Sequence, residues 1–308
     1  MKKFTCNADL IDDDLKRNLM LFSLYQNIGY TKFKSSNFEL YDFYREHRDF
    51  LVCDKMISFS DTDGTLLAMR ADVTLSIINA FNNLNNITKK LYYDEDVYRV
   101  SKFTGKFKRY RQLGIECFGD VSNKDLQEVI DLSLSSLSLL SKDFLLVVSD
   151  MRILMSVVDL FCLNNRDKNE LLAFISRKDI EGLKLFLKSR RANINYTSYL
   201  IDLLNINLVS NSKVESELKK ITSALNLTNE FDAFKGVFSK LKKSEYFKNI
   251  QVDFSLFGDT NYYSGLYFNG FISSKGEVVL AGGEYDKLLE KLGKTGKAIG
   301  FAIFQDRL

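Results

Sequence analysis

Apolar residues recur along the chain with two different periods, which predict a mixture of helices and strands. Over residues 12–28 they are spaced three and four positions apart, as on one face of a helix, and Gly29 follows as a natural C-terminal stop. The same helical period returns at residues 125–140, and residues 144–149 then have the pattern of a strand.

Two hairpins are predicted between these helices. The first pairs residues 56–60 with 65–70 across a polar turn, and Asp72 is placed to cap a helix over residues 74–81. The second hairpin pairs residues 91–100 with residues 109–119 across a basic loop. Alternation along its return strand places Gln112 and Glu116 on one face, with Leu113, Ile115 and Cys117 on the other.

The second half of the chain changes character. Residues 164–248 are rich in Lys, Asn and Leu and helical in period, whereas strand patterns resume at residues 252–256 and 265–273. This order predicts an α+β fold in three parts, which are a core segment at 1–163, an all-helical insertion at 164–248 and a second core segment at 249–308.

The last 28 residues have the pattern of a glycine turn at Gly282 and Gly283, a helix, and an apolar strand that ends near Arg307. An arginine beside a glycine turn is a common arrangement for holding a phosphate or a carboxylate. This signal predicts a nucleotide site, although it is weak when taken alone.

Composition excludes several classes of protein. The 43 basic and 40 acidic residues nearly balance, which does not indicate a protein that coats nucleic acid. The four isolated cysteines predict reduced, mostly buried thiols rather than disulfides or a metal site. The single histidine, His47, is interpreted as an exposed polar helix residue. The N-terminal residues have no apolar stretch typical of a signal peptide, and no apolar run is long enough for a membrane span. We therefore expect a cytoplasmic protein without a membrane partner.

Three polar groups lie where simple packing would not require them. Arg70, Asp72 and Thr74 cluster at a strand-to-helix junction, where the alternative is a helix cap beside an exposed arginine. Arg99, Gln112 and Glu116 share a hairpin and would suit an ammonium group or an imidazole N–H, unless they form a solvated strand face. Tyr262 and Tyr263 are adjacent at a turn, where the alternative is aromatic packing.

These segments together resemble the class II aminoacyl-tRNA synthetase fold, and specifically the histidyl-tRNA synthetase family. The matching stretches are M-R-A-D-V-T at 69–74, Y-R at 98–99 with R-Y-R-Q-L-G-I-E-C-F-G at 109–119, Y-Y-S-G at 262–265, and G-G-E-Y-D at 282–286 through R-L at 307–308. They follow the family's order from about residue 12 to 308, apart from the helical insertion.

The resemblance implies a six- or seven-stranded antiparallel sheet flanked by helices, and a dimer formed through the first helix and strand. It also implies a histidine pocket formed by Asp72, Thr74, Gln112, Glu116, Tyr262 and Tyr263. The residues that match the family's nucleotide site are Arg99, Gly282, Gly283 and Arg307.

Several positions depart from the family pattern. Ser101 replaces an acidic residue that holds the adenine, Gly258 replaces an arginine that stabilises the reacting groups, and Asn261 replaces an aspartate. Ser36 replaces a proline and Glu284 replaces the arginine of G-G-R. Loss of a preorganised cation from such a site costs several kcal/mol of transition-state stabilisation.

A synthetase-like body with these losses, and with no anticodon-binding domain expected after residue 308, resembles the regulatory subunit of ATP phosphoribosyltransferase. That resemblance implies no catalytic residue, cofactor or metal in this chain and no tRNA substrate. The implied partner is a short-form catalytic subunit that condenses ATP with phosphoribosyl pyrophosphate. The chain is then a homodimer within a hetero-oligomer, with histidine as effector.

Two alternatives remain at this point. The chain is an amino-acid-activating ligase like histidyl-tRNA synthetase, or it is a binding paralogue that acts on RNA or a kinase. The basic loop at residues 102–108 is the one feature that favours the second alternative.

Overall fold

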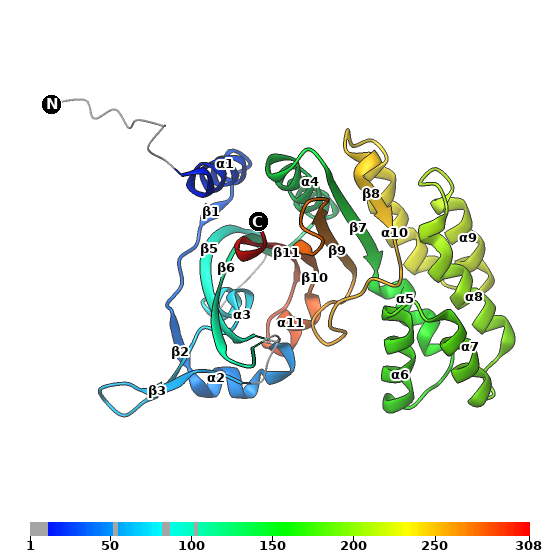
Figure 1. The fold of residues 1–308 in the computed structure, drawn as a ribbon, viewed down its shortest axis with the longest axis horizontal. Coiled ribbons are helices and arrows are strands. Elements are labelled where there is room, and N and C mark those ends of the chain that lie inside the picture. Colours follow the sequence, from blue (N-terminus) through cyan, green and yellow to red (C-terminus); the bar gives the residue numbers. More distant parts are fainter. Residues whose placement is uncertain (1–11, 52–54, 82–86, 102–103) are drawn as a thin grey trace.

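The computed structural model describes residues 12–51, 55–81, 87–101 and 104–308. Within these residues the chain is organised around an eight-stranded sheet (Figure 1). Its strands, in spatial order, are β1 (Thr31–Lys32), β5 (Lys89–Val100), β6 (Phe107–Gly119), β11 (Lys297–Phe304), β10 (Val278–Glu284), β9 (Leu266–Ile272), β7 (Phe144–Asp150) and β8 (Ile250–Val252). Neighbouring strands are antiparallel except for the outer pairs β1–β5 and β7–β8, which are parallel. The predicted α+β fold is confirmed, although the sheet has eight strands rather than the expected six or seven and is not wholly antiparallel.

Helices α1 (Asp13–Asn27) and α4 (Asn123–Leu140) cover one face of this sheet. Both predicted helices are confirmed to within two residues at each end, and side chains cap their N-termini. Tyr25 of α1 is buried, and its hydroxyl is 2.9 Å from Oγ of Ser136 on α4. Leu113, Ile115 and Cys117 of β6 belong to this core, as alternation predicted.

The other face is covered by α3 (Val73–Asn79), α11 (Asp286–Lys291) and a small three-stranded sheet. The small sheet has the order β2 (Phe38–Leu40), β4 (Leu66–Met69), β3 (Ser58–Ser60), and it packs on α2 (Tyr41–Glu46). Asp72 caps α3 by accepting the N–H of Leu75 at 3.0 Å, as predicted. The alternative of an exposed Arg70 beside this cap is wrong, because that side chain is fully buried.

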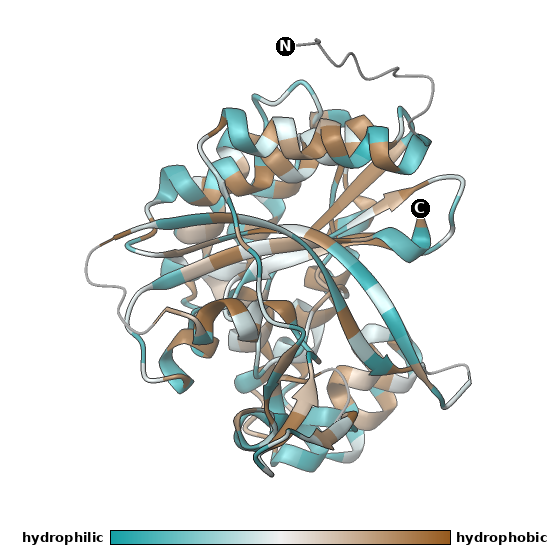
Figure 2. Cartoon of the chain, turned by 90° about the vertical axis from the view of Figure 1, so that its left-hand side faces the viewer, coloured by the Kyte–Doolittle hydropathy of each residue, from teal (hydrophilic) through white to brown (hydrophobic). Residues whose placement is uncertain are grey.

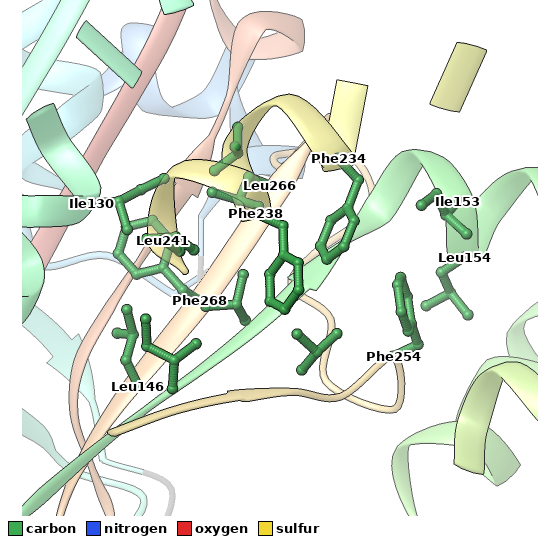
Figure 3. Close-up of a cluster of buried hydrophobic side chains, with 14 of the residues drawn as sticks. Ile130, Leu146, Ile153, Leu154, Phe234, Phe238, Leu241, Phe254, Leu266 and Phe268 are labelled. Atoms are coloured by element: carbon green, nitrogen blue, oxygen red, sulfur yellow. The ribbon is translucent and has the colours of Figure 1, made fainter. Parts of the chain in front are cut away.

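The segment between β7 and β8 is helical. It contains α5 (Met151–Asp159), α6 (Asn165–Ser176), α7 (Ile180–Ser189), α8 (Ile194–Leu204), α9 (Val214–Ala224) and α10 (Thr228–Leu241). Figure 3 shows that α10 is anchored to the sheet: Phe234 and Phe238 stack at 5.3 Å beside Phe254, Leu266 and Phe268. The helical character is confirmed, while the three-part domain division stays a prediction.

The structure corrects the interpretation of two C-terminal segments. Gly282 and Gly283 lie inside β10 and pair with strands on both sides, so they do not form a turn. A Cβ on Gly282 would lie 2.5 Å from Cβ of Phe301. This close strand packing requires a glycine, so no turn is needed to explain the residue. The strand predicted at 252–256 ends at Val252, because the Asp253 carboxylate accepts the N–H of Ser255 and turns the chain.

Isolated residues also differ from expectation. Cys117 is buried but Cys162 is exposed, and Cys6 and Cys53 lie outside the described residues. His47 is half-buried just after α2, with Nδ1 2.7 Å from the carbonyl of Phe43, and is not an exposed helix residue. None of the described helices combines the length and apolarity needed to cross a membrane.

Candidate functional site

A cavity of about 450 Å³ opens on the sheet face that carries α3 and α11. Small residues of β10 and β11 line its floor, and its wall includes the segment that precedes β9. We call this cavity the pocket. It is lined by all of the predicted histidine-pocket residues, namely Asp72, Thr74, Gln112, Glu116, Tyr262 and Tyr263, and by Arg99.

Glu116 carries a buried carboxyl group in this pocket. The hydroxyl of Thr74 donates to its Oε1 at 2.6 Å, and the hydroxyl of Tyr285 donates to its Oε2 at 2.5 Å. Burial raises the pKa of Glu116 to about 8, although these two hydrogen bonds oppose the shift. The Glu116 carboxyl group is therefore mostly protonated at neutral pH.

Asp72 and Arg99 form an ion pair at the pocket wall. Nη2 of Arg99 is 2.8 Å from Oδ2 of Asp72, and its Nε donates to the carbonyl of Ala71 at 2.6 Å. Burial raises the pKa of Asp72, and the charge of Arg99 opposes that shift. Among the described residues that line the pocket, Arg99 is the one cation, and it is already bound to a carboxylate.

Tyrosine rings form much of the remaining wall. Tyr262 lies 4.8 Å from Tyr263 and 5.8 Å from Tyr285, measured between ring centroids. Burial raises the pKa of all three phenols, so they stay protonated as hydrogen-bond donors. Sequence reasoning missed Tyr285 and Tyr93 as lining residues. Tyr285 lies inside the G-G-E-Y-D stretch, which was the available signal.

Glycines let these groups approach the backbone closely. A Cβ on Gly300 would lie 1.9 Å from Oε2 of Glu116. A Cβ on Gly283 would lie 2.9 Å from the ring of Tyr263, and one on Gly258 would lie 2.3 Å from the same ring. Tyr263 thus fills the space beside Gly258, the position at which the family resemblance implies an arginine.

The remaining nucleotide-site candidates do not line the pocket. Arg307 lies in a 3₁₀ turn, donates to the carbonyl of Val278 at 2.6 Å, and has its guanidinium 4.2 Å from the ring centroid of Phe304. Gly282 and Gly283 are buried within β10, where they accommodate aromatic rings. The structure therefore brings together all six predicted histidine-pocket residues, but of the nucleotide-site candidates only Arg99 lines the pocket.

The packing at Gly258 leads to a testable prediction. Gly258→Ala is expected to lower the free energy of unfolding by about 1–3 kcal/mol, because the new methyl group must displace the ring of Tyr263. Gly236→Ala is the control: Gly236 is exposed in α10 with open space around it, so alanine there should be neutral or stabilising by up to about 1 kcal/mol. Urea denaturation measures the free energy of unfolding of both variants. Equal free energies of unfolding for the two variants would contradict the packing of Tyr263 on Gly258.

The geometry suits a small polar molecule rather than a polyphosphate. A buried carboxyl, an ion-paired carboxylate, the amide of Gln112 and several phenols offer partners for an ammonium group and a ring N–H. Phosphate binding usually requires cations or backbone N–H groups free to face the ligand.

Comparison with known proteins gives the family. The family profile described as "Histidyl-tRNA synthetase" matches residues 13–308. The chain is 29% identical over 302 residues to a protein of Clostridium acetobutylicum named "ATP phosphoribosyltransferase regulatory subunit", an alignment that covers 96% of this chain and 74% of that protein.

Two solved structures have a similar fold, which confirms the predicted synthetase-like architecture. One, from Bacillus halodurans, is described as an "ATP phosphoribosyltransferase regulatory subunit/histidyl-tRNA synthetase", with a TM-score of 0.82, 21% identity, and coverage of 99% of this chain and 81% of that one. The other is the "ATP phosphoribosyl transferase (HisG:HisZ) complex" from Thermotoga maritima, with a TM-score of 0.68, 18% identity, and coverage of 96% and 98%. The chain therefore belongs to the histidyl-tRNA synthetase family, and curated relatives similar to it along most of its length are named ATP phosphoribosyltransferase regulatory subunits.

Proposed function

We propose that this chain is the non-catalytic regulatory subunit of an ATP phosphoribosyltransferase, which acts in the cytoplasm at the first step of histidine biosynthesis. The reaction, ATP with phosphoribosyl pyrophosphate to phosphoribosyl-ATP, takes place on a short catalytic partner. Histidine is the inhibitor, and the regulatory subunit makes the rate of the catalytic partner depend on the histidine concentration. No tRNA takes part.

The observation that carries this proposal is that no arginine side chain among the described residues is free to face a ligand in the pocket. Arg99 is bound to Asp72, Arg307 lies against Phe304 outside the pocket, and Gly258 stands where the family has an arginine. A synthetase needs such cations to stabilise the charge that develops on the reacting carboxylate and phosphate. The names of the relatives support the same conclusion.

The surface of α1 supports the homodimer that we include in this proposal. Leu15, Leu19, Met20 and Ile28, on and just after α1, are each exposed by 45% or more. Adjacent exposed apolar side chains of this kind are typical of protein interfaces.

The experiment mixes the purified chain with a short catalytic subunit and measures phosphoribosyl-ATP formation. We expect activity to rise when the chain is added and to fall again when histidine is added. Histidine inhibition also requires that histidine bind two states of the complex with different affinities. No complex and no activation would contradict the proposal.

The second candidate is an amino-acid-activating ligase, favoured because all six predicted histidine-pocket residues line the pocket. Histidine-dependent exchange between ATP and pyrophosphate separates the two functions. We expect no exchange by the chain alone, whereas rapid exchange would establish the ligase.

A further inference from the structure

A buried ionic cluster lies behind the pocket, where β7 leads into α5. Nη2 of Arg152 is 2.6 Å from Oδ2 of Asp150 and 3.2 Å from Oε1 of Glu284. The Asp150 side chain is fully buried, that of Glu284 is 5% exposed and that of Arg152 is 30% exposed. The negative charges of two buried carboxylates are therefore compensated by one guanidinium, that of Arg152.

Glu284 also holds the backbone that leads out of the pocket wall. Its Oε1 accepts the N–H of Leu266 at 3.0 Å, and its carbonyl accepts the N–H of Ser264 at 2.9 Å. A Cβ on Gly265 would lie 2.7 Å from the carboxyl carbon of Glu284, so the side chain sits directly against this backbone. Residues 264–266 are thus fixed at several points immediately after Tyr262 and Tyr263.

The helix that carries Arg152 contacts the same backbone. The N–H of Met151, the first residue of α5, donates to the carbonyl of Gly265 at 2.8 Å. A second cavity of about 360 Å³ adjoins this contact and is lined by Arg152, Tyr263 and Ser264 together with residues of α5 and α10. Tyr263 lines both cavities, so the space behind its ring is bordered by Arg152.

We propose that the Arg152–Glu284 ion pair is a positioning contact for the pocket. It holds the backbone of residues 264–266, and thereby the rings of Tyr262 and Tyr263, in the arrangement that an amino-acid ligand requires. It acts through these tyrosines and does not touch the ligand itself. The identity of the ligand as histidine rests on the proposed function, whereas the positioning of the two tyrosines does not.

The first test needs no ligand. Arg152→Met and the milder Glu284→Gln and Arg152→Lys are compared with the unmodified chain by amide hydrogen exchange. We expect faster exchange confined to residues 262–266 in Arg152→Met and Glu284→Gln, with a smaller change in Arg152→Lys. Lys242→Met is the matched control, because Lys242 is also 30% exposed and pairs with Glu215 at 2.5 Å, but lies on the helical segment. Unchanged exchange at 262–266 in folded Glu284→Gln, or acceleration spread over the whole chain, would overturn the proposal.

The second test measures binding of histidine by calorimetry. We expect Glu284→Gln to weaken binding about tenfold, as for coupled neighbouring residues, and Lys242→Met to leave it unchanged. Arg152→Lys keeps a positive charge beside Glu284 and should retain more of the affinity than Arg152→Met. Faster exchange in Glu284→Gln with unchanged histidine affinity would overturn the positioning role. If the unmodified chain binds no histidine, the ligand assignment of the proposed function fails, and the exchange result alone decides whether the contact positions the tyrosines.

Discussion

Arg70→Met is expected to lower the free energy of unfolding by about 3–5 kcal/mol, because it leaves a buried carboxylate without its partner. Arg70 is fully buried, and its Nη2 is 2.6 Å from Oε2 of Glu95, which is itself only 10% exposed. The guanidinium also donates to the side chains of Ser35 and Asn37 and to the carbonyls of Ser36 and Asp96. One side chain therefore joins residues 35–37, which lead into β2 of the small sheet, to β5.

Urea denaturation of the two proteins measures this loss. Arg109→Met is the control, since Arg109 is 68% exposed and lies 3.7 Å from the carboxylate of Asp96. Loss of such an exposed pair should cost less than about 1 kcal/mol. If the two variants lost similar stability, Arg70 would not be the anchor that its contacts indicate.

Glu116→Gln is expected to remove a pH dependence of stability that spans neutral pH. The folded chain keeps the Glu116 proton up to about pH 8, whereas the unfolded chain loses it near the ordinary glutamate value of 4.5. Between these values the folded state binds more protons than the unfolded state, so stability falls as pH rises. The contribution of Glu116 to the free energy of unfolding is fully present below the unfolded pKa and is lost as pH rises through the folded pKa. Between the two pKa values the loss is on the order of 1 kcal/mol per pH unit.

The measurement is urea denaturation of the unmodified and Glu116→Gln chains between about pH 5 and pH 8. The difference between the two curves isolates Glu116, because Asp72 and the other titrating groups are present in both chains. We expect the Gln variant to become relatively more stable with rising pH. A constant difference between the two chains would show that the Glu116 carboxyl is ionised in the fold throughout this range.

Much of the secondary structure was predictable because its signals are local. Asp72 caps α3, and the side chains of β6 point alternately to the core and to the pocket as expected. Helices α1 and α4 begin and end within two residues of their predicted bounds. Periodicity and capping depend on residues a few positions apart, so they can be read along the chain. The glycines of β10 were misread because glycine serves turns and close strand packing equally, and neighbouring sequence does not distinguish the two.

The composition of the site was also largely predictable, but its electrostatics were not. Sequence alone determined most of the helix and strand order and the family resemblance, and the resemblance gave the six residues that meet in the pocket. The tertiary structure decided that Arg99 pairs with Asp72, that Arg307 lies outside, and that Arg152 compensates Glu284. The reason is physical: an ion pair depends on which strands lie side by side and how deeply they are buried, and residues 152 and 284 meet only through that long-range packing.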